Sequence, residues 1–360
     1  MASVTSDSAT YRSPLLDYPG AAPAQGPDSS VDSAGVAWHY GDPLGEQRGA
    51  VVIDRSHRGV IRVSGADAAV FLNNLLSQKL DDVPPGFAAA ALDLDIQGHV
   101  LHHADVLRVG EDFYLDLPSA QAATLLPFLQ KMIFWSQVTV DAADVAVLTL
   151  LAPLIDVPLP PAVLAFREVA WPVGRRDLLV ERSSLVSVVE ELLASGYQLA
   201  GLMTFTAARV RALEPELAAD LDHKSIPHEV PAWIGRGTSP GAVHLEKGCY
   251  RGQETVARVE NLGRSPRVLV MLQLDGSAPT LPAPGADITT ASGGRTIGRL
   301  GTVVHDHDFG PIALALVKRS ALGGELRIGD VAALIDPTSL PVEENEQAGR
   351  AAINRLRGDS

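Results

Sequence analysis

The only cysteine of the chain lies in a segment whose residue types could support thiol chemistry. Residues 247–254 read Lys-Gly-Cys-Tyr-Arg-Gly-Gln-Glu, so Cys249 has one cation two positions before it and another two positions after it. Cations close to sulfur favour the thiolate, which is the nucleophile and metal ligand, over the neutral thiol. Lys247 and Arg251 would therefore activate Cys249 if glycines at 248 and 252 hold a tight loop. The alternative is that Cys249 is a small buried core residue, as free cysteines often are.

The last two residues of this segment could bind a heterocycle. The side chains of Gln253 and Glu254 can exchange hydrogen bonds with a ring such as a pterin. Glutamate is also common at the exposed start of a helix, so a purely structural interpretation of this pair stays open.

Two runs of histidine are candidate metal ligands, and we expect no metal at either. His102 and His103 are neighbours in an expected strand, so their side chains point to opposite faces. His305 and His307 would share a face, but Gly310 marks a loop there. A single cysteine also excludes an internal disulfide, a cysteine-rich zinc site and a cluster held by four cysteines of this chain.

The composition is that of an acidic globular protein. Of 360 residues 46% are hydrophobic, and the net charge is −14. An acidic chain has no general attraction for phosphate backbones, so we expect no nucleic-acid partner. The N-terminus has no basic region followed by an apolar run, and the longest apolar stretch, 145–155, is too short to span a membrane. We therefore expect a cytoplasmic protein without a membrane partner, a location that suits a free thiol.

Strands and helices of mixed order must position these side chains. Two β-rich runs joined by a polar turn open the chain's ordered part, and a β-meander follows a short helix. Strands are expected over 50–53, 59–63, 88–95, 100–109, 112–117, 138–140, 145–151 and 177–180, and helices after 64–67 and over 120–131, 184–195 and 203–213. This mixture predicts an α+β fold.

The pattern changes twice before the C-terminus. A long irregular stretch, 216–247, leads to the thiol segment, and long loops of this kind are usually functional or disordered. Short strands with Pro/Gly turns then predict a small β-barrel, at 267–274, 287–290, 296–305, 312–317 and 330–334. We divide the chain into a disordered N-terminal segment (1–33), an α+β domain (34–264), a C-terminal β-barrel (265–337) and a tail (338–360).

The segment 247–254 resembles the signature of the YgfZ family, which is related to the T-protein (aminomethyltransferase) of the glycine cleavage system. Other stretches agree with this resemblance: 54–59 with 63–68, 208–210 with 226–229, 298–301 and 313–317. It covers about residues 36–336. It implies a T-protein-like, tetrahydrofolate-binding domain of two pseudo-symmetric α+β halves followed by the barrel.

The resemblance also implies roles for individual residues. Proteins of the family support assembly or repair of iron–sulfur clusters, so the expected partners are cluster-dependent client enzymes or assembly proteins and a reduced folate. Cys249 would be the functional thiol, assisted by Lys247. The residues expected to bind the folate, or a one-carbon derivative of it, are Tyr250, Arg251, Gln253, Glu254, Glu229 and Arg209.

Departures from the T-protein pattern bear on the reaction. Histidines at 102 and 103 stand where the T-protein has an acidic pair, and Arg211 stands where it has a glutamate. Aminomethyl transfer needs an acid beside the folate nitrogens, so these changes argue against that reaction. Glu229 could replace the lost pterin contact. A folate-dependent aminomethyltransferase or one-carbon transferase stays the alternative, and a pure binding module with a structural Cys249 is a third interpretation.

Overall fold

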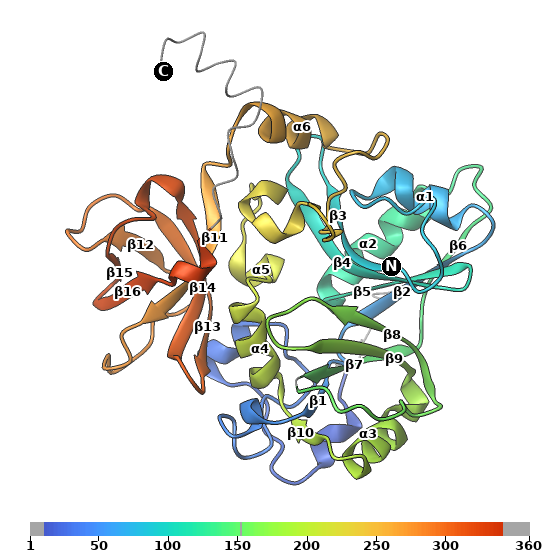
Figure 1. Cartoon of the computed structure of the whole chain (residues 1–360), viewed down its shortest axis with the longest axis horizontal. Coiled ribbons are helices and arrows are strands. Elements are labelled where there is room, and N and C mark those ends of the chain that lie inside the picture. Colours follow the sequence, from blue (N-terminus) through green and yellow to red (C-terminus); the bar gives the residue numbers. More distant parts are fainter. Residues whose placement is uncertain (1–10, 152, 341–360) are drawn as a thin grey trace, which may run out of the picture.

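The computed structural model describes residues 11–151 and 153–340, which form two five-stranded sheets and a closed six-stranded barrel (Figure 1). The predicted α+β fold with a C-terminal barrel is confirmed. Of the expected disordered segment and tail, residues 1–10 and 341–360 lie outside the described residues. No helix in the described ranges is long and apolar enough to cross a lipid bilayer.

The first sheet contains the predicted meander. Its strand order is β3-β4-β5-β2-β6, and α1 and α2 cover one face of it. The elements are β2 (Gly59–Ser64), α1 (Ala68–Leu75), β3 (Ala88–Leu94), β4 (Val100–Val109), β5 (Asp112–Leu117), α2 (Ser119–Lys131) and β6 (Thr139–Ala142). The helices bury apolar side chains such as Phe71, Leu72 and Leu125 on the sheet.

The second sheet has the order β10-β1-β7-β9-β8, with β10 parallel to β1. It consists of β1 (Val51–Asp54), β7 (Val145–Leu151), β8 (Val163–Val169), β9 (Arg175–Glu181) and β10 (Gln198–Ala200), with α3 (Leu185–Ala194) packed on it. The polar turn after β1 is where the sequence predicts it. It joins the two sheets rather than two paired strands, because β1 pairs with β7 and β2 pairs with β5 and β6.

The chain after the second sheet leads through an irregular stretch to the barrel. It contains α4 (Leu202–Arg211), α5 (Leu217–Asp220) and α6 (Gln253–Leu262). The barrel strands are β11 (Arg267–Leu274), β12 (Asp287–Thr290), β13 (Gly298–Asp306), β14 (Gly310–Lys318), β15 (Leu326–Ile328) and β16 (Val331–Ile335). Inward-facing residues such as Val270, Leu272 and Ala315 fill the barrel, while alternate residues such as Leu269 and Leu314 join the central core.

The N-terminal segment differs from the disorder expected for residues 1–33. Residues 11–33 pack along the second sheet, where Leu15 and Val31 are buried. The hydroxyl of Ser13 donates to Asp54 at the end of β1. The segment is small and polar in composition, but its few apolar residues are spaced so that they insert into cores formed by residues far away in the sequence.

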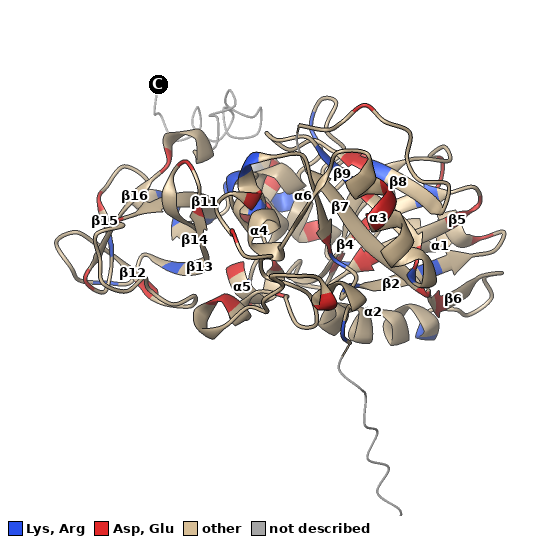
Figure 2. Ribbon diagram, turned by 90° about the horizontal axis from the view of Figure 1, so that it is seen from below, with Lys and Arg blue, Asp and Glu red and all other residues tan. Residues whose placement is uncertain are grey.

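Buried ion pairs join the two sheets. Arg167 on β8 donates to Asp177 on β9 at 2.7 Å and to Asp105 on β4 at 3.2 Å, and it also contacts Asp116 on β5. Its side chain is only 3% exposed. Arg58, in the turn between β1 and β2, donates to Asp116 at 2.6 Å. Acidic and basic positions are marked along both sheets in Figure 2. One guanidinium therefore neutralises carboxylates from both sheets.

Replacing Arg167 by alanine should destabilise the protein strongly. The substitution removes the cation shared by two buried carboxylates and the partly exposed Asp105, a loss of about 3–5 kcal/mol in the free energy of unfolding. Urea unfolding followed by circular dichroism measures the change. Arg62→Ala is the matched control, because Arg62 is half exposed beside Asp112 and should cost less than about 1 kcal/mol. Equal losses in the two variants would contradict this role of Arg167.

Candidate functional site

The thiol of Cys249 is exposed on the loop that precedes α6. The alternative of a buried core cysteine is therefore wrong. Gly252 ends the loop with φ at 80°, a conformation that favours glycine. A Cβ atom at this position would lie 2.6 Å from the carbonyl oxygen of Asp95, at the tip of the β3–β4 hairpin. The loop can therefore pack on the hairpin only because residue 252 has no side chain.

Lys247 fixes the N-terminal side of the loop. Its ammonium donates to the carbonyl oxygen of Leu76 at 2.5 Å and also to that of Asn73, at the C-terminal end of α1. Terminal carbonyls lack helical partners and favour a cation, so Lys247 caps α1. Burial lowers the pKa of Lys247 to about 8, which still leaves the amine protonated at neutral pH.

Arg251 fixes the other side of the loop. Its guanidinium donates to Asp93 on β3 at 2.5 Å and lies over the ring of Phe128. The second carboxylate oxygen of Asp93 is 2.9 Å from Nδ1 of His102 on β4, and Nε2 of His102 is 2.8 Å from the hydroxyl of Thr124 on α2. Asp93 is almost fully buried, so this chain of contacts ties the thiol loop to the first sheet and to α2.

The remaining residues of the segment have different environments. The ring of Tyr250 lies 4.7 Å from the ammonium of Lys247, and burial raises the pKa of its phenol to about 12. The backbone N–H of Gln253 donates to the carbonyl oxygen of Tyr250 at 3.3 Å as α6 begins. Glu254 is exposed in the first turn of α6, where a helix favours a negative charge. The structure thus assigns both expected cations to anchoring the loop, which fixes the position of the thiol.

Arg209 and Glu229 lie at the junction between the α+β domain and the barrel. Arg209 donates to Asp220 at 2.7 Å and to the hydroxyl of Thr302 on β13 at 2.6 Å. The carboxylate of Glu229 accepts from Arg267, the first residue of β11, at 2.7 and 3.0 Å. Both side chains are almost completely buried in these contacts, which attach the barrel to the domain.

A second cluster of polar side chains lies on β4 and its neighbours, and sequence reasoning missed it. Glu214 accepts from the indole N–H of Trp171 at 2.9 Å and from Arg175 at 3.1 Å. His103 lies close to this cluster, and its ring packs against that of Trp233 at a tilt of 47°, with centroids 4.9 Å apart. Asp105, two positions further along β4, shares the face of His103. The alternation of side chains along this strand could have shown from the sequence that His103 and Asp105 share a face. The position of Glu214 depends on tertiary packing and could not have been read in this way.

Charge interactions set the protonation of this cluster. Burial alone would raise the pKa of Glu214, but the nearby guanidinium of Arg175 outweighs it and holds the pKa at about 2. The carboxylate is therefore ionised at neutral pH, and its side chain is 21% exposed. Burial lowers the pKa of His103, and its Nε2 atom is buried without a hydrogen-bond partner. The cluster thus combines a partly exposed carboxylate with an unsatisfied imidazole nitrogen beside aromatic rings.

Part of the second histidine run has the spacing of a possible metal site. The potential ligand atoms of Asp306, His307 and Asp308 lie within 4.8 Å of one another at the β13–β14 turn. Arg211 is 3.6 Å from the carboxylate of Asp306, so a metal ion there would compete with an existing cation. The contacts give no support for a metal at this position.

Comparisons with known proteins agree with this fold. Residues 267–341 match the family described as CAF17, C-terminal beta-barrel domain. The structure resembles the glycine cleavage system aminomethyltransferase T from Bartonella henselae, with a TM-score of 0.73, 19% sequence identity and coverage of 92% of this chain and 96% of that chain. The chain therefore has the T-protein fold and carries a CAF17-type barrel.

Proteins of similar sequence indicate more closely which kind of protein this chain resembles. A chloroplastic Arabidopsis thaliana protein, named as a transferase, is 25% identical over 312 residues, 78% of this chain and 69% of the relative. The mitochondrial iron–sulfur cluster assembly factor IBA57 of Mus musculus is 26% identical over 292 residues, 75% and 78% of the two chains. The tRNA-modifying protein YgfZ of Klebsiella pneumoniae is 26% identical over 247 residues, 64% and 73%. The chain is thus similar in sequence to YgfZ and IBA57 and has the fold of the T-protein, in agreement with the resemblance of its signature segment.

The two glycines of the thiol loop should respond differently to alanine. Gly252→Ala places a residue with a side chain in a left-handed backbone conformation, which costs about 1–2 kcal/mol. The added Cβ atom also clashes with the backbone of Asp95, which increases the cost. Gly248→Ala is the control, because nothing lies within 4 Å of the added atom. Thermal unfolding measures both. If the Gly252 variant unfolds at the same temperature as the Gly248 variant, the loop does not pack on the hairpin as described.

Proposed function

We propose that the chain is a tetrahydrofolate-binding accessory protein for iron–sulfur cluster assembly or repair, with Cys249 as its functional thiol. The observation that carries the proposal is an exposed sulfur on a loop anchored at both sides, by Lys247 to α1 and by Arg251 to Asp93. An anchored and accessible thiol can meet a partner at a defined position. Relatives named as an iron–sulfur cluster assembly factor support this assignment.

A single thiol limits what the protein can do with a cluster. Iron–sulfur clusters in proteins are usually held by several cysteine ligands, and this chain has one. The cluster is therefore cargo or substrate, with most of its ligands supplied by a client enzyme or an assembly protein. In this proposal Cys249 contacts the cluster, a one-carbon adduct or a client thiol, while Lys247, Tyr250, Arg251, Gln253 and Glu254 form its setting.

The cluster around Glu214 suits the pterin of a reduced folate. The amino and ring N–H groups of a pterin form a donor edge that matches an ionised carboxylate, and Glu214 is ionised and partly exposed. The partly buried Trp171 offers an aromatic surface nearby, and the unpartnered Nε2 of His103 can accept a further hydrogen bond. Glu214 thus takes the role that the sequence analysis gave to Glu229. A bound folate would supply one-carbon chemistry.

The proposed setting is cytoplasmic, with cluster-dependent enzymes or assembly proteins as partners. A reducing compartment keeps a lone exposed thiol free. The net charge of −14 gives no general attraction for nucleic acid, although the YgfZ relatives are named for tRNA modification. A client that itself modifies tRNA would reconcile these two observations without direct RNA binding.

A folate-dependent one-carbon transferase is the second candidate, and Asp105 favours it. This acid lies two positions after His103, close to where the T-protein pattern requires one. However, Asp105 accepts a hydrogen bond from Arg167 at 3.2 Å, and the nearby Arg167 and Arg175 lower its pKa against the effect of burial. A carboxylate with a depressed pKa is a weak general base. The accessory role is therefore the better match to the geometry.

Replacing Cys249 by alanine should abolish support of a cluster-dependent client enzyme while leaving the fold intact, because the thiol is exposed. The measurement is client activity after reconstitution or in cells that lack the wild-type protein. Glu246→Ala is the control, since Glu246 is exposed in the same segment and should leave client activity unchanged. Full client activity in the Cys249 variant would remove this role of the thiol.

Replacing Glu214 by glutamine should weaken binding of a reduced folate by about tenfold or more, because the ionised acceptor for the pterin is lost. Titration with formyltetrahydrofolate, followed by tryptophan fluorescence, measures the affinity, since Trp171 and Trp233 flank the proposed site. Glu168→Gln is the control, because Glu168 is exposed on β8. Equal affinity of both variants would place the folate elsewhere, and no binding by the wild-type chain would end the folate proposal.

A further inference from the structure

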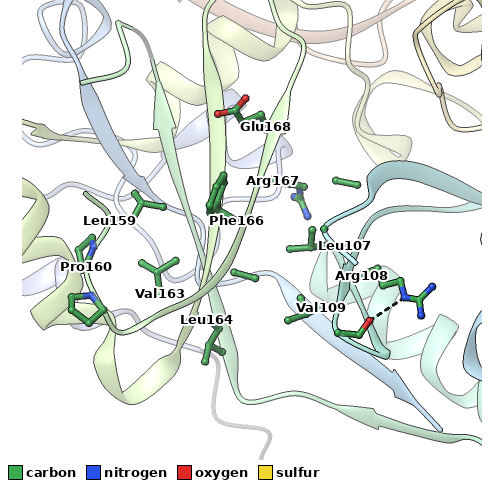
Figure 3. Close-up of a pocket in the computed structure, with 15 residues that line it drawn as sticks. Leu107, Arg108, Val109, Leu159, Pro160, Val163, Leu164, Phe166, Arg167 and Glu168 are labelled. Carbon is green, nitrogen blue, oxygen red and sulfur yellow. Dashed lines mark hydrogen bonds between the residues drawn. The ribbon is translucent and has the colours of Figure 1, made fainter. Parts of the chain in front are cut away.

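A recess lies between the two sheets, and neither the thiol loop nor Glu214 lines it. It has a volume of about 850 Å³ and is lined by β4, by β8 and by the segment before β8 (Figure 3). Most of its lining side chains are apolar, including Leu107, Val109, Leu159, Val163, Leu164 and Phe166. Leu164 and Phe166 are 44% and 46% exposed, so the recess opens to solvent along β8. Its size is in the range of pockets that hold small organic molecules.

The recess is the unfilled end of the core between the sheets. The inner faces of the two sheets meet through buried residues such as Val60, Leu107 and Leu179. Towards β8 the facing side chains become small, with Ala88 on β3 and Ala165 on β8 lining the open space. Close packing therefore stops at this end, and a molecule that fills the gap would gain the contacts that the chain itself does not make.

The charged groups that line this recess already have partners, and Glu168 accepts from Arg176 at 2.7 Å. Arg167 is bound by Asp105, Asp116 and Asp177. Arg108 donates to the carbonyl oxygen of Gly110 at 3.0 Å and to Glu111 at 3.0 Å. A charged ligand would lose its hydration here without gaining an unpaired partner. The chemistry therefore favours an uncharged ligand with an apolar body.

The form of β8 disfavours an extended peptide as the occupant. A peptide would add to the outer edge of β8 by continuous backbone pairing. However, Pro160 and Pro161 precede the strand, and its register shifts between Val163 and Ala165. Prolines and bulges are features that protect an edge strand from pairing with another chain. A gap between two sheet faces instead suits a flat ring system.

We propose that this recess binds a small, uncharged molecule with a flat, apolar ring system, inserted between β4 and β8. The site is separate from Cys249 and from Glu214, and it does not depend on the folate proposal. Phenylnaphthylamine is a suitable probe, because it is uncharged and fluoresces when it leaves water. Anilinonaphthalene sulfonate has nearly the same ring system with an added negative charge, so it should bind at least about tenfold more weakly.

Two substitutions test the position of the probe. Ala165→Phe fills the recess, and Leu164→Lys puts a charge at its rim, where folding is not at risk because Leu164 is exposed. Each should weaken phenylnaphthylamine binding by about tenfold or more. Phe134→Ala is the control, since Phe134 is an exposed apolar residue outside the recess and its loss should leave binding unchanged.

Three results would overturn the proposal. One is the absence of saturable phenylnaphthylamine binding to the wild-type chain. Another is binding that survives both Ala165→Phe and Leu164→Lys, or that is lost only in Phe134→Ala. The third is equal or tighter binding of the anionic probe. Circular dichroism of each variant separates a lost site from a lost fold, and addition of formyltetrahydrofolate without displacement of the probe distinguishes this site from the folate site.

Discussion

The position of both candidate sites depends on the ion pairs between the two sheets. Four arginines and four carboxylates form this network: Arg55, Arg58, Arg167, Arg175, Asp105, Asp116, Asp177 and Glu214. A charge inside a protein is tolerated only when an opposite charge is held against it. The sheets can therefore take only the arrangement in which Arg167 reaches Asp105 and Asp116 across the interface. Apolar packing alone would allow the sheets to slide, whereas the ion pairs select one arrangement.

Strand β4 carries residues of both sites on its two faces. His102 faces Asp93 and, through it, the anchor of the thiol loop. His103 and Asp105 face the other way, towards Trp233 and Arg175. Side chains alternate along a strand, so adjacent histidines serve different surroundings. The histidine pair, which resembles a metal site or a lost acidic pair in the sequence, is thus explained by a strand that lies between the two candidate sites.

The sequence predicts the parts of the structure that depend on local pattern. The meander, the helices over 120–131 and 184–195 and most barrel strands follow from spacing and turn residues. Prediction from the sequence fails for those parts of the structure that contacts between distant residues determine. Lys247 meets Asn73 and Leu76 across more than 170 residues, so nothing near it in the sequence shows that its charge caps α1. Strand β8 lies at the edge of its sheet and has an irregular hydrophobic pattern, so the sequence does not indicate it. The N-terminal segment is ordered because it packs on cores formed by residues far away in the sequence.

The separation of the thiol from the acid cluster constrains any joint mechanism. The thiol loop is attached to the Asp93 and His102 face of the β3–β4 hairpin, whereas Glu214 lies with the His103 and Asp105 face. In the proposed arrangement, a pterin held by Glu214 would influence the loop through the hairpin rather than through the pterin contact expected at Arg251. Binding of folate would order β4, where His102 contacts Asp93, the partner of Arg251 on β3. Under this proposal the folate would act by fixing the loop that presents the sulfur, and a binding site without a strong general base would then still serve thiol chemistry.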